Sequence, residues 1–271
     1  MSKIDTPRKP AEEKLRPDAV ELLEQLNSRI DELLHLQRIG LLKDNVIRFP
    51  YNDVEIALYV PWAERDFIQK NIVRYGRFYE SNLLEKLRTD VELPPRPVML
   101  DVGANIGNHT VFFGAVMNAS RIVAVEPQNT VRAILQRNLE LNGLESLVAT
   151  VSSLVGSSEG QASIKDYPLK NSGGTSFSED GEGDYDMTTL DAICAKLDNR
   201  VDFAKIDVEG MHVEVLGGAD RMLSEIRPKI WMELRSFKAE FDEAEAILKK
   251  YDYVHSSKLG AHDHIFVPVD G

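Results

Sequence analysis

Apolar runs and amphipathic stretches take turns along the last two thirds of the chain. Short apolar runs predict strands, and between them apolar residues recur at spacings of three and four, which predicts helices. This alternation is typical of a mostly parallel sheet covered by helices on both faces. The expected strands span residues 98–101, 121–126, 147–152, 201–207 and 229–233, and the expected helices 108–118, 129–142, 213–225 and 240–250.

Two further apolar runs close the chain, at about 252–257 and 263–268. The short link around Leu259-Gly260-Ala261 predicts that they form an antiparallel hairpin at one edge of the sheet. With the five strands before them, they give an α/β fold with a seven-stranded, mostly parallel sheet.

An extension of about 90 residues precedes this domain. A proline-rich stretch at 94–97 separates it from the main domain, for which we predict the range 94–271. The extension is predicted to contain a flexible tail (1–16), and then, over 17–93, a helix (17–39), a hairpin (45–60) and two helices (63–75 and 79–88).

The first of these helices has an apolar face. Leu23, Leu26, Ile30 and Leu33 recur at spacings of three and four. Two interpretations stay open at this point. The helix packs on its own domain, or it pairs with a second copy of the chain in a homodimer.

A long polar segment at 166–187 lies between the third and fourth strands of the main domain. We expect a solvated loop there, with a lid over the substrate or a divalent-ion site as alternatives. Five acidic residues stand close together in it: Glu179, Asp180, Glu182, Asp184 and Asp186.

Composition and charge exclude several classes. The 32 basic and 44 acidic residues give a net charge of −12, which disfavours binding to nucleic acid. Cys194 is the single cysteine, so no internal disulfide forms. The first ten residues lack the apolar core of a signal peptide, and the longest apolar stretch, 111–117, is too short to span a membrane. We therefore expect a cytoplasmic chain without a membrane span.

Four of the expected strands end on or near a carboxylate, at Asp101, Glu126, Asp207 and Glu233. The carboxyl ends of parallel strands meet at the edge where open α/β sheets bind ligands. Carboxylates gathered there repel each other, so they favour a cationic or hydroxyl-rich ligand. We expect a positively charged ligand between them.

Glycines follow the first of these carboxylates in the order Asp101-Val-Gly103-Ala-Asn105-Ile-Gly107. The spacing differs from the Gly-x-Gly-x-x-Gly pattern of dinucleotide sites, and Asp101 would repel a pyrophosphate but attract a sulfonium. Glu126, at the end of the next strand, is able to accept hydrogen bonds from both hydroxyls of a ribose. Nicotinamide enzymes use an acid in the same way, so Glu126 alone does not discriminate between the two classes.

Together with other short motifs, these residues resemble the FkbM family from about residue 79 to 266. The resemblance implies a Rossmann-like, class I methyltransferase that uses S-adenosyl-L-methionine, and acceptors that are hydroxyls of sugars, glycans or natural products. The motifs are Asp101–Gly107, Val125-Glu126-Pro127, Asn138-Leu-Glu-Leu-Asn142, Thr189-Leu190-Asp191, Lys205–Gly210 and Val215–Ala219.

The resemblance also implies where the cofactor binds. Gly103, Asn105 and Gly107 are expected to line its methionine part, Glu126 to accept its ribose hydroxyls, and a Tyr79-Glu80 pair to close over it. The full expected set is Glu80, Asp101, Gly103, Ala104, Asn105, Gly107, His109, Thr110, Glu126, Pro127, Gln128, Ser153 and Asp207.

Methyl transfer to a hydroxyl also needs a base. Asp207 and Glu209 are two residues apart and face the same way in an extended chain, so we expect them, with Glu233, to contact the hydroxyl. His212 is a second candidate base, at a position where many relatives carry a Glu. No bound metal is predicted, although Asp207, Glu209 and Glu233, or the imidazoles of 262–264, are alternative ligands.

Two other classes of function stay open. One is a nicotinamide-dependent oxidoreductase, weakened by the glycine spacing and by Asp101. The other is a catalytically silent assembly protein that uses helix 17–39 as its partner surface. The retained Asp101, Gly103, Gly107 and Glu126 count against it.

Overall fold

The computed structural model describes residues 17–166, 176–178, 185–208, 210–235 and 239–269. The predicted tail over 1–16 and Glu209 lie outside this range.

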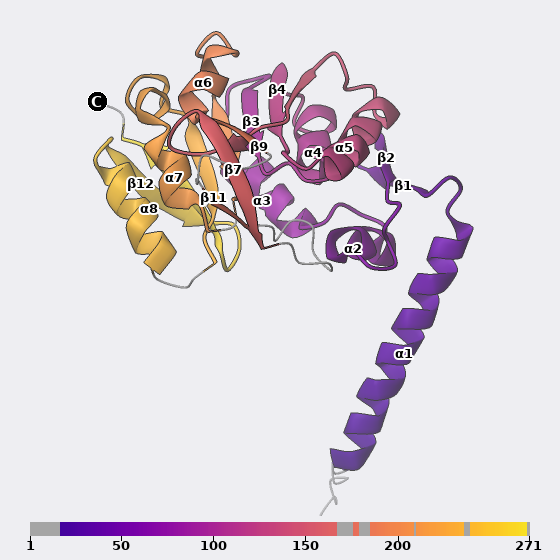
Figure 1. Cartoon of the computed structure of the whole chain (residues 1–271). Coiled ribbons are helices and arrows are strands. Elements are labelled where there is room, and N and C mark those ends of the chain that lie inside the picture. Colours follow the sequence, from indigo (N-terminus) through magenta and orange to yellow (C-terminus); the bar gives the residue numbers. More distant parts are fainter. Residues whose placement is uncertain (1–16, 167–175, 179–184, 209, 236–238, 270–271) are drawn as a thin grey trace, which may run out of the picture.

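The core of the molecule is the predicted seven-stranded sheet, in the order β12-β13-β11-β10-β3-β4-β5 (Figure 1). The five strands β3, β4, β5, β10 and β11 are parallel, and β13 is antiparallel to both β11 and β12. The C-terminal hairpin therefore forms one edge, as expected. The bounds are β3 Val98–Val102, β4 Arg121–Val125, β5 Val148–Val151, β10 Phe203–Ile206, β11 Lys229–Glu233, β12 Tyr253–Lys258 and β13 Asp263–Pro268.

Helices cover both faces of this sheet. Side chains alternate along β3, so Met99 packs into one hydrophobic cluster and Leu100 into the other. The first cluster holds α3 (Ser81–Asp90), α4 (Asn108–Ala115) and α5 (Asn129–Leu141), and the second holds α6 (Leu190–Ala195), α7 (His212–Gly217) and α8 (Ala239–Lys249).

The helix expected over 213–225 is divided in two. It ends at Gly217, and a π-helical turn, Met222–Ile226, follows. Gly218 packs so closely that a Cβ there would lie 2.2 Å from the Gly156 carbonyl oxygen. Asp191 accepts hydrogen bonds from the backbone N–H groups of Arg221 and Met222, at 2.9 and 2.8 Å. The Thr189-Leu190-Asp191 motif thus fixes the start of the π-helical turn.

The N-terminal hairpin is part of the first cluster. β1 (Val46–Tyr51) pairs antiparallel with β2 (Val54–Tyr59), as predicted. Two asparagines, one in α5 and one directly after it, bind the free edge of β2: Asn138 accepts from the N–H of Tyr59, and Asn142 accepts from the N–H and donates to the carbonyl of Ala57. This explains the two asparagines of the Asn138–Asn142 motif, because they satisfy backbone groups at a sheet edge.

The polar segment is not simply a solvated loop. Its described ends belong to a second, four-stranded sheet in the order β6-β9-β7-β8, with bounds β6 Leu154–Val155, β7 Gly160–Asp166, β8 Ser176–Ser178 and β9 Tyr185–Thr188. Ala162 and Met187 are buried in the second cluster, which is why these ends are ordered strands. Asp186 is exposed on β9, and the acids at 179–184 lie outside the described residues.

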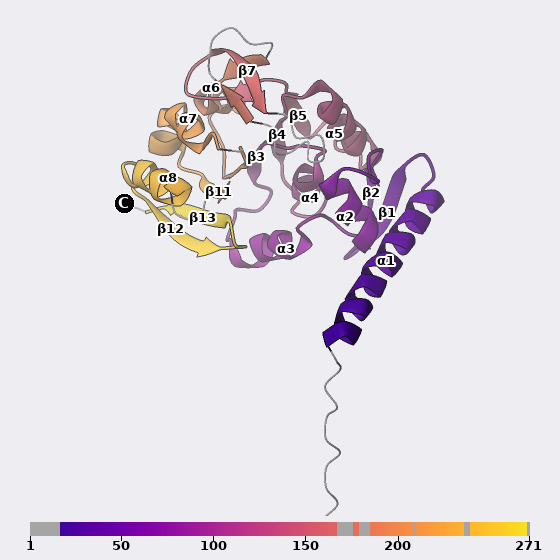
Figure 2. The same cartoon turned by 60° about the horizontal axis from the view of Figure 1, so that its bottom comes forward.

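Helix α1 (Pro17–Leu41) projects away from the sheet (Figures 1 and 2). Only its C-terminal half contacts the body, through α2 (Phe67–Tyr75) and the turn before it. His35 Nε2 lies 3.0 Å from the Ala63 carbonyl oxygen, and Asp31 pairs with Arg74 at 3.1 Å. The helix therefore does pack on its own domain, but through a polar face, and Leu23, Leu26, Ile30 and Leu33 of the apolar face stay exposed.

No helix in the described ranges is long and apolar enough to cross a lipid bilayer.

Candidate active site

A cavity of about 540 Å³ opens at the carboxyl ends of β3, β4, β10 and β11. This is the edge at which the sequence predicts a ligand site. Most of the predicted residues line it: Glu80, Gly103, Ala104, Asn105, His109, Glu126, Pro127, Gln128, Ser153, Asp207 and Glu233.

The glycines of the loop after β3 make room for the protein's own chain. Gly103 has φ +79°, and a Cβ there would lie 2.0 Å from the backbone carbonyl oxygen of Asp207. Gly107 has φ +83°, and a Cβ there would lie 2.4 Å from Leu135 Cδ1. Gly103 therefore lets the ends of β3 and β10 approach each other, and Gly107 lets α4 pack on α5. The expectation that both glycines admit a ligand needs this correction, since Gly107 does not line the cavity.

Glu126 is held by backbone donors on the β4 side of the cavity. Its Oε2 accepts from the Asn105 N–H at 3.1 Å and its Oε1 from the Gln128 N–H at 2.8 Å. Burial raises the pKa of Glu126 to about 7, against the opposing effect of these two donors. A carboxylate has about four lone-pair sites, so two remain for hydroxyls in the cavity.

On the β10 side, Asp207 is paired with a buried lysine. Lys205 Nζ lies 2.9 Å from Asp207 Oδ2, and the lysine side chain is 2% exposed. Burial opposes ionisation of Asp207, but the Lys205 ammonium, a hydrogen bond from Glu233 and the charge of His109 together outweigh it and keep the pKa of Asp207 below its ordinary value. The sequence predicts these clustered carboxylates but not the lysine among them. Lys205 does not line the cavity, so it does not fill the space.

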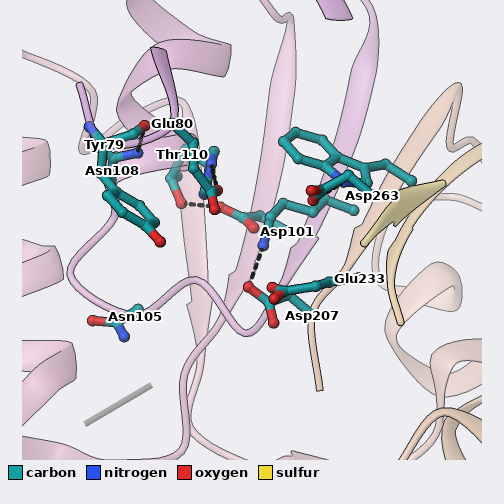
Figure 3. Close-up of polar contacts among 12 residues, drawn as sticks. Tyr79, Glu80, Asp101, Asn105, Asn108, Thr110, Asp207, Glu233 and Asp263 are labelled. Carbon is teal, nitrogen blue, oxygen red and sulfur yellow. Dashed lines mark hydrogen bonds and ion pairs between the residues drawn. The ribbon is translucent and has the colours of Figure 1, made fainter. Parts of the chain in front are cut away.

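Glu233, at the end of β11, lies beside Asp207 (Figure 3). Burial, and then the neighbouring Asp207 carboxylate, raise the pKa of Glu233 to about 8. Arg235 Nε donates to Glu233 Oε1 at 2.6 Å and opposes this rise. Because Asp207 stays ionised while Glu233 takes up a proton near neutral pH, the pair acts as one acid–base unit.

The Tyr79-Glu80 pair lines the cavity and is bound to the start of α4, directly after the glycine loop. Asn108 accepts from the Tyr79 N–H at 2.9 Å and donates to the Tyr79 carbonyl at 3.0 Å, which fixes the backbone there. Glu80 has a left-handed backbone (φ +56°) that turns its side chain toward His109, and its Oε2 lies 3.2 Å from His109 Nε2. Burial opposes the charged form of Glu80, yet His109 outweighs it and the pKa of Glu80 is lowered.

Some predicted site residues do not reach the cavity. Asp101 is fully buried behind its wall and accepts a 2.5 Å hydrogen bond from Thr110. The expectation that Asp101 faces a positively charged ligand is therefore corrected, and Thr110 is a partner of Asp101. His212 is buried between α7 and α8, where its Nε2 lies 3.0 Å from Glu243 Oε2. His212 does not line the cavity, so the structure gives no support for its predicted role as a base. In the described part of the chain, no group of three or more potential ligands is arranged to hold a metal.

Several cavity residues escaped the sequence analysis. Phe67 and Ile68 come from α2, a helix that the pattern predicts without indicating what it covers. Arg235 follows β11 just after the last residue of the strand, where no pattern singles it out. The additional wall residues are Phe67, Ile68, Val102, Ile106, Asn108, Val125, Leu154, Val155, Val208, Met211 and Arg235.

The fold is Rossmann-like, with the cavity at the carboxyl ends of its parallel strands. A crystal structure of a methyltransferase FkbM from Methylobacillus flagellatus KT has the same fold, with a TM-score of 0.51 and 18% sequence identity. The match covers 72% of this chain and 51% of that one, so this chain spans about half the length of the solved protein.

Sequence comparison gives the family. The profile of the methyltransferase FkbM domain matches residues 101–254, more than half of the chain, and the chain belongs to this family. The chain is 25% identical over 209 residues to Methyltransferase 1 of Beauveria bassiana (strain ARSEF 2860), and the alignment covers 69% of this chain and 80% of the relative. It is 26% identical over 161 residues to Methyltransferase sdnD of Sordaria araneosa, covering 47% and 62%. The methyltransferase prediction is confirmed, and the oxidoreductase alternative is set aside.

Proposed function

We propose that this protein transfers a methyl group from S-adenosyl-L-methionine to a hydroxyl of a small molecule or glycan. The observation that carries the proposal is the division of one cavity into two ends. Glu126, held by backbone donors, is at one end, and the Asp207–Glu233 pair is at the other.

The residues present fit the cofactor. Glu126 has two lone-pair sites left for the ribose hydroxyls. Pro127, Leu154 and Val155 give the same end of the cavity an apolar wall suited to a flat base. The carboxylates at the opposite end suit the cationic sulfonium and ammonium groups. When bound, the cofactor supplies a methyl group that the acceptor oxygen takes as the carbon–sulfur bond breaks, with its electron pair staying on sulfur.

The chain's own part in the reaction is to position the acceptor and to take its proton. Positioning supplies much of the rate when the leaving group is already good. The acceptor hydroxyl loses its proton during or after attack, and the ionised fraction of Glu233, which grows as the pH rises toward its pKa of about 8, is able to receive it. Asp207 stays ionised beside Glu233 and helps to position the acceptor hydroxyl.

A neutral, hydroxyl-rich acceptor best fits the end of the cavity that holds Asp207 and Glu233. Glu80, Asp207 and Glu233 all face the cavity, and the basic side chains in its described wall, His109 and Arg235, are already paired with Glu80 and Glu233. An acceptor with a phosphate or carboxylate group would be repelled here. Sugars and hydroxylated natural products meet this requirement.

Calorimetry with S-adenosylhomocysteine and with NAD tests the cofactor. We expect binding of the former only, and a loss of about tenfold or more in affinity in Glu126→Gln, because hydrogen bonds to a charged group contribute about 1.5–3 kcal/mol each. Binding of NAD alone would overturn the proposal. The acceptor is then tested by transfer of labelled methyl to a panel of matched neutral sugars, uronic acids, sugar phosphates and amines. Transfer to the amines alone would contradict methylation of a hydroxyl.

We also propose that α1 pairs with the α1 of a second copy. Of the exposed large hydrophobic residues in the described chain, most are on α1, where Leu33 is 67% exposed. Leu23, Leu26, Ile30 and Leu33 are spaced three, four and three residues apart, which is the spacing of a two-helix seam. This seam faces away from the polar side that contacts α2.

The charges of α1 favour an antiparallel partner of the same sequence. The first half carries Asp18, Glu21 and Glu24 and no basic residue, whereas Arg29 at the midpoint and Arg38 offset the acids Asp31 and Glu32 in the second half. An antiparallel pair brings these halves together. With five acids against two arginines, the helix is poorly suited to an anionic membrane.

Light scattering of the full chain tests the pairing. We expect a dimer for the wild type and a monomer for the double variant Leu26→Asp and Ile30→Asp. Ser28→Asp, on the same helix outside the seam, serves as the control and should remain dimeric. A monomeric wild type that instead sediments with vesicles of anionic lipid would overturn the assignment.

A further inference from the structure

Lys205 is a buried, charged side chain that neither lines the cavity nor takes part in the proposed steps of methyl transfer. It is the one lysine or arginine that is buried among the described residues. Burying an ammonium is costly unless a partner compensates for it, so its partners indicate what it does.

The sheet register fixes where the lysine side chain lies. Lys205 of β10 is opposite Asp101 on β3 and opposite Trp231 on β11, and side chains at paired positions of parallel strands share a face. Its Nζ lies 5.7 Å from the centroid of the Trp231 ring, within the range of a cation–π contact. The side chain is thus enclosed on both sides, and its ammonium reaches Asp207 at the cavity end.

Asp101 supplies a second, independent observation. One of its oxygens accepts from Thr110, but its Oδ1 is buried and accepts no hydrogen bond from the described residues. The Lys205 ammonium is close enough to interact with Asp101 as well as with Asp207. The Lys205 ammonium therefore stabilises the charge of two carboxylates, Asp101 behind the cavity wall and Asp207 in the wall.

The surroundings of Lys205 are otherwise acidic. Figure 3 shows Asp101, Asp207, Glu233 and Asp263 around one region of the site. Trp231 Nε1 donates to Asp263 at 3.0 Å, which ties the fourth carboxylate to the ring that covers the lysine. The charged and titratable groups that face the cluster from the surrounding elements are Tyr79, Glu80, Asp101, His109, Asp207, Glu233, Arg235 and Asp263.

We propose that Lys205 is a positioning residue for the methyl transfer. Its ammonium keeps Asp207 ionised and in place, so that the proton taken from the acceptor goes to Glu233. This inference rests on the proposed function for its consequence, but its electrostatic part holds for the free chain.

Removing the cation has a defined consequence for protonation. Without Lys205, Asp207 loses the group that stabilises its charged form, so its pKa rises. The Asp207–Glu233 pair then holds more protons at neutral pH, and fewer molecules have a free base. The acidic limb of the kcat profile therefore moves to higher pH, and kcat at pH 7 falls by about tenfold or more.

The decisive experiment is a carboxyl ¹³C NMR titration of the free, full-length chain with labelled aspartate, in which Asp207→Asn assigns the signal. In the wild type we expect Asp207 to stay ionised below the usual range of an aspartate. In Lys205→Met we expect its midpoint to rise by about one pH unit or more, a tenfold change in proton affinity. Lys249→Met removes a surface ion pair with Glu245 (2.8 Å) and should leave Asp207 unchanged.

Each outcome decides a separate point. A wild-type Asp207 that titrates at or above the ordinary value overturns the inference even if Lys205→Met fails to fold. An unchanged midpoint in a folded Lys205→Met does the same. Kinetics add a double-mutant cycle: Lys205→Met should cost little further kcat in an Asp207→Asn background. If the NMR shift occurs but no methyl transfer is found with any acceptor, the proposed function fails while the electrostatic role stands.

Discussion

The two sides of the cavity hold a buried carboxylate by different means. On the β4 side, Glu126 accepts hydrogen bonds from two backbone N–H groups. On the β10 side, Asp207 is held by the ammonium of a single buried side chain, Lys205. Both acids end a parallel strand next to β3, so their position in the fold is equivalent and only their partners differ.

This difference suits two different tasks. Backbone donors are fixed by the main chain and carry no full charge, so Glu126 keeps a raised pKa of about 7 and remains a good acceptor for hydroxyls. A lysine carries a full charge, which lowers the pKa of Asp207 and leaves the neighbouring Glu233 to gain or lose a proton near neutral pH. We infer that the residues on the β4 side bind the cofactor and that those on the β10 side take up the proton of the acceptor hydroxyl.

The largest effect is expected from Glu233→Gln, which removes the proton acceptor while keeping the size of the side chain. A positioned base contributes about 10²–10⁴-fold, so kcat should fall by about a hundredfold or more. The affinity for S-adenosylhomocysteine, measured by calorimetry, should change little because Glu126 is untouched. Glu126→Gln provides the matched comparison, with weaker cofactor binding and a smaller fall in kcat at saturation. If both variants behaved alike, the two sides would not be functionally distinct.

Gly103→Ala tests the close approach of β3 to β10, on which the shared cavity depends. The new Cβ would meet the Asp207 carbonyl, and the positive φ is unfavourable for alanine. Left-handed backbone costs about 1–2 kcal/mol and overpacking about 1–3 kcal/mol, so we expect a loss of about 2–5 kcal/mol. Gly143→Ala has a similar φ of +66° but open space around it, and should lose about 1–2 kcal/mol. If chemical denaturation gave equal losses of unfolding free energy for the two variants, the contact with β10 would add nothing to the cost of a side chain at Gly103.

The sequence predicts the β4 side better than the β10 side. Strand ends and the glycine spacing place Glu126 and the loop before it, because both depend on local pattern. Lys205 is enclosed by Asp101 and Trp231, which are brought beside it by the sheet register, and no local pattern reveals register between distant strands. The same limit explains Asp101 and His212. Their partners, Thr110 and Glu243, show that each contacts the protein and not the cavity.

The N-terminal region shows another limit. The spacing of leucines predicts α1 but not its surroundings, since the same stripe serves a helix packed on its own domain or one paired with another chain. The polar content of 166–187 indicates a loop, yet its described ends belong to strands β7 and β9, which bury Ala162 and Met187 in the second cluster. Composition averages over such single contacts, so it does not detect them.

The pH dependence of stability provides the last comparison, and it arises on the β4 side. Glu126 has an ordinary pKa of 4.5 and a folded pKa of about 7, so the folded state binds the proton more tightly than the unfolded state. Its contribution is therefore fully present below pH 4.5 and is lost as the pH rises toward 7, at most about 3 kcal/mol. Glu126→Gln cannot ionise, so its free energy of unfolding should improve relative to the wild type between pH 5 and 8, as measured by urea denaturation without cofactor. Lys205→Met should leave this pH-dependent difference unchanged, because the lysine acts on the β10 side. A difference between Glu126→Gln and the wild type that stays flat with pH would mean that Glu126 is already ionised in the free protein and that the two sides are electrostatically alike.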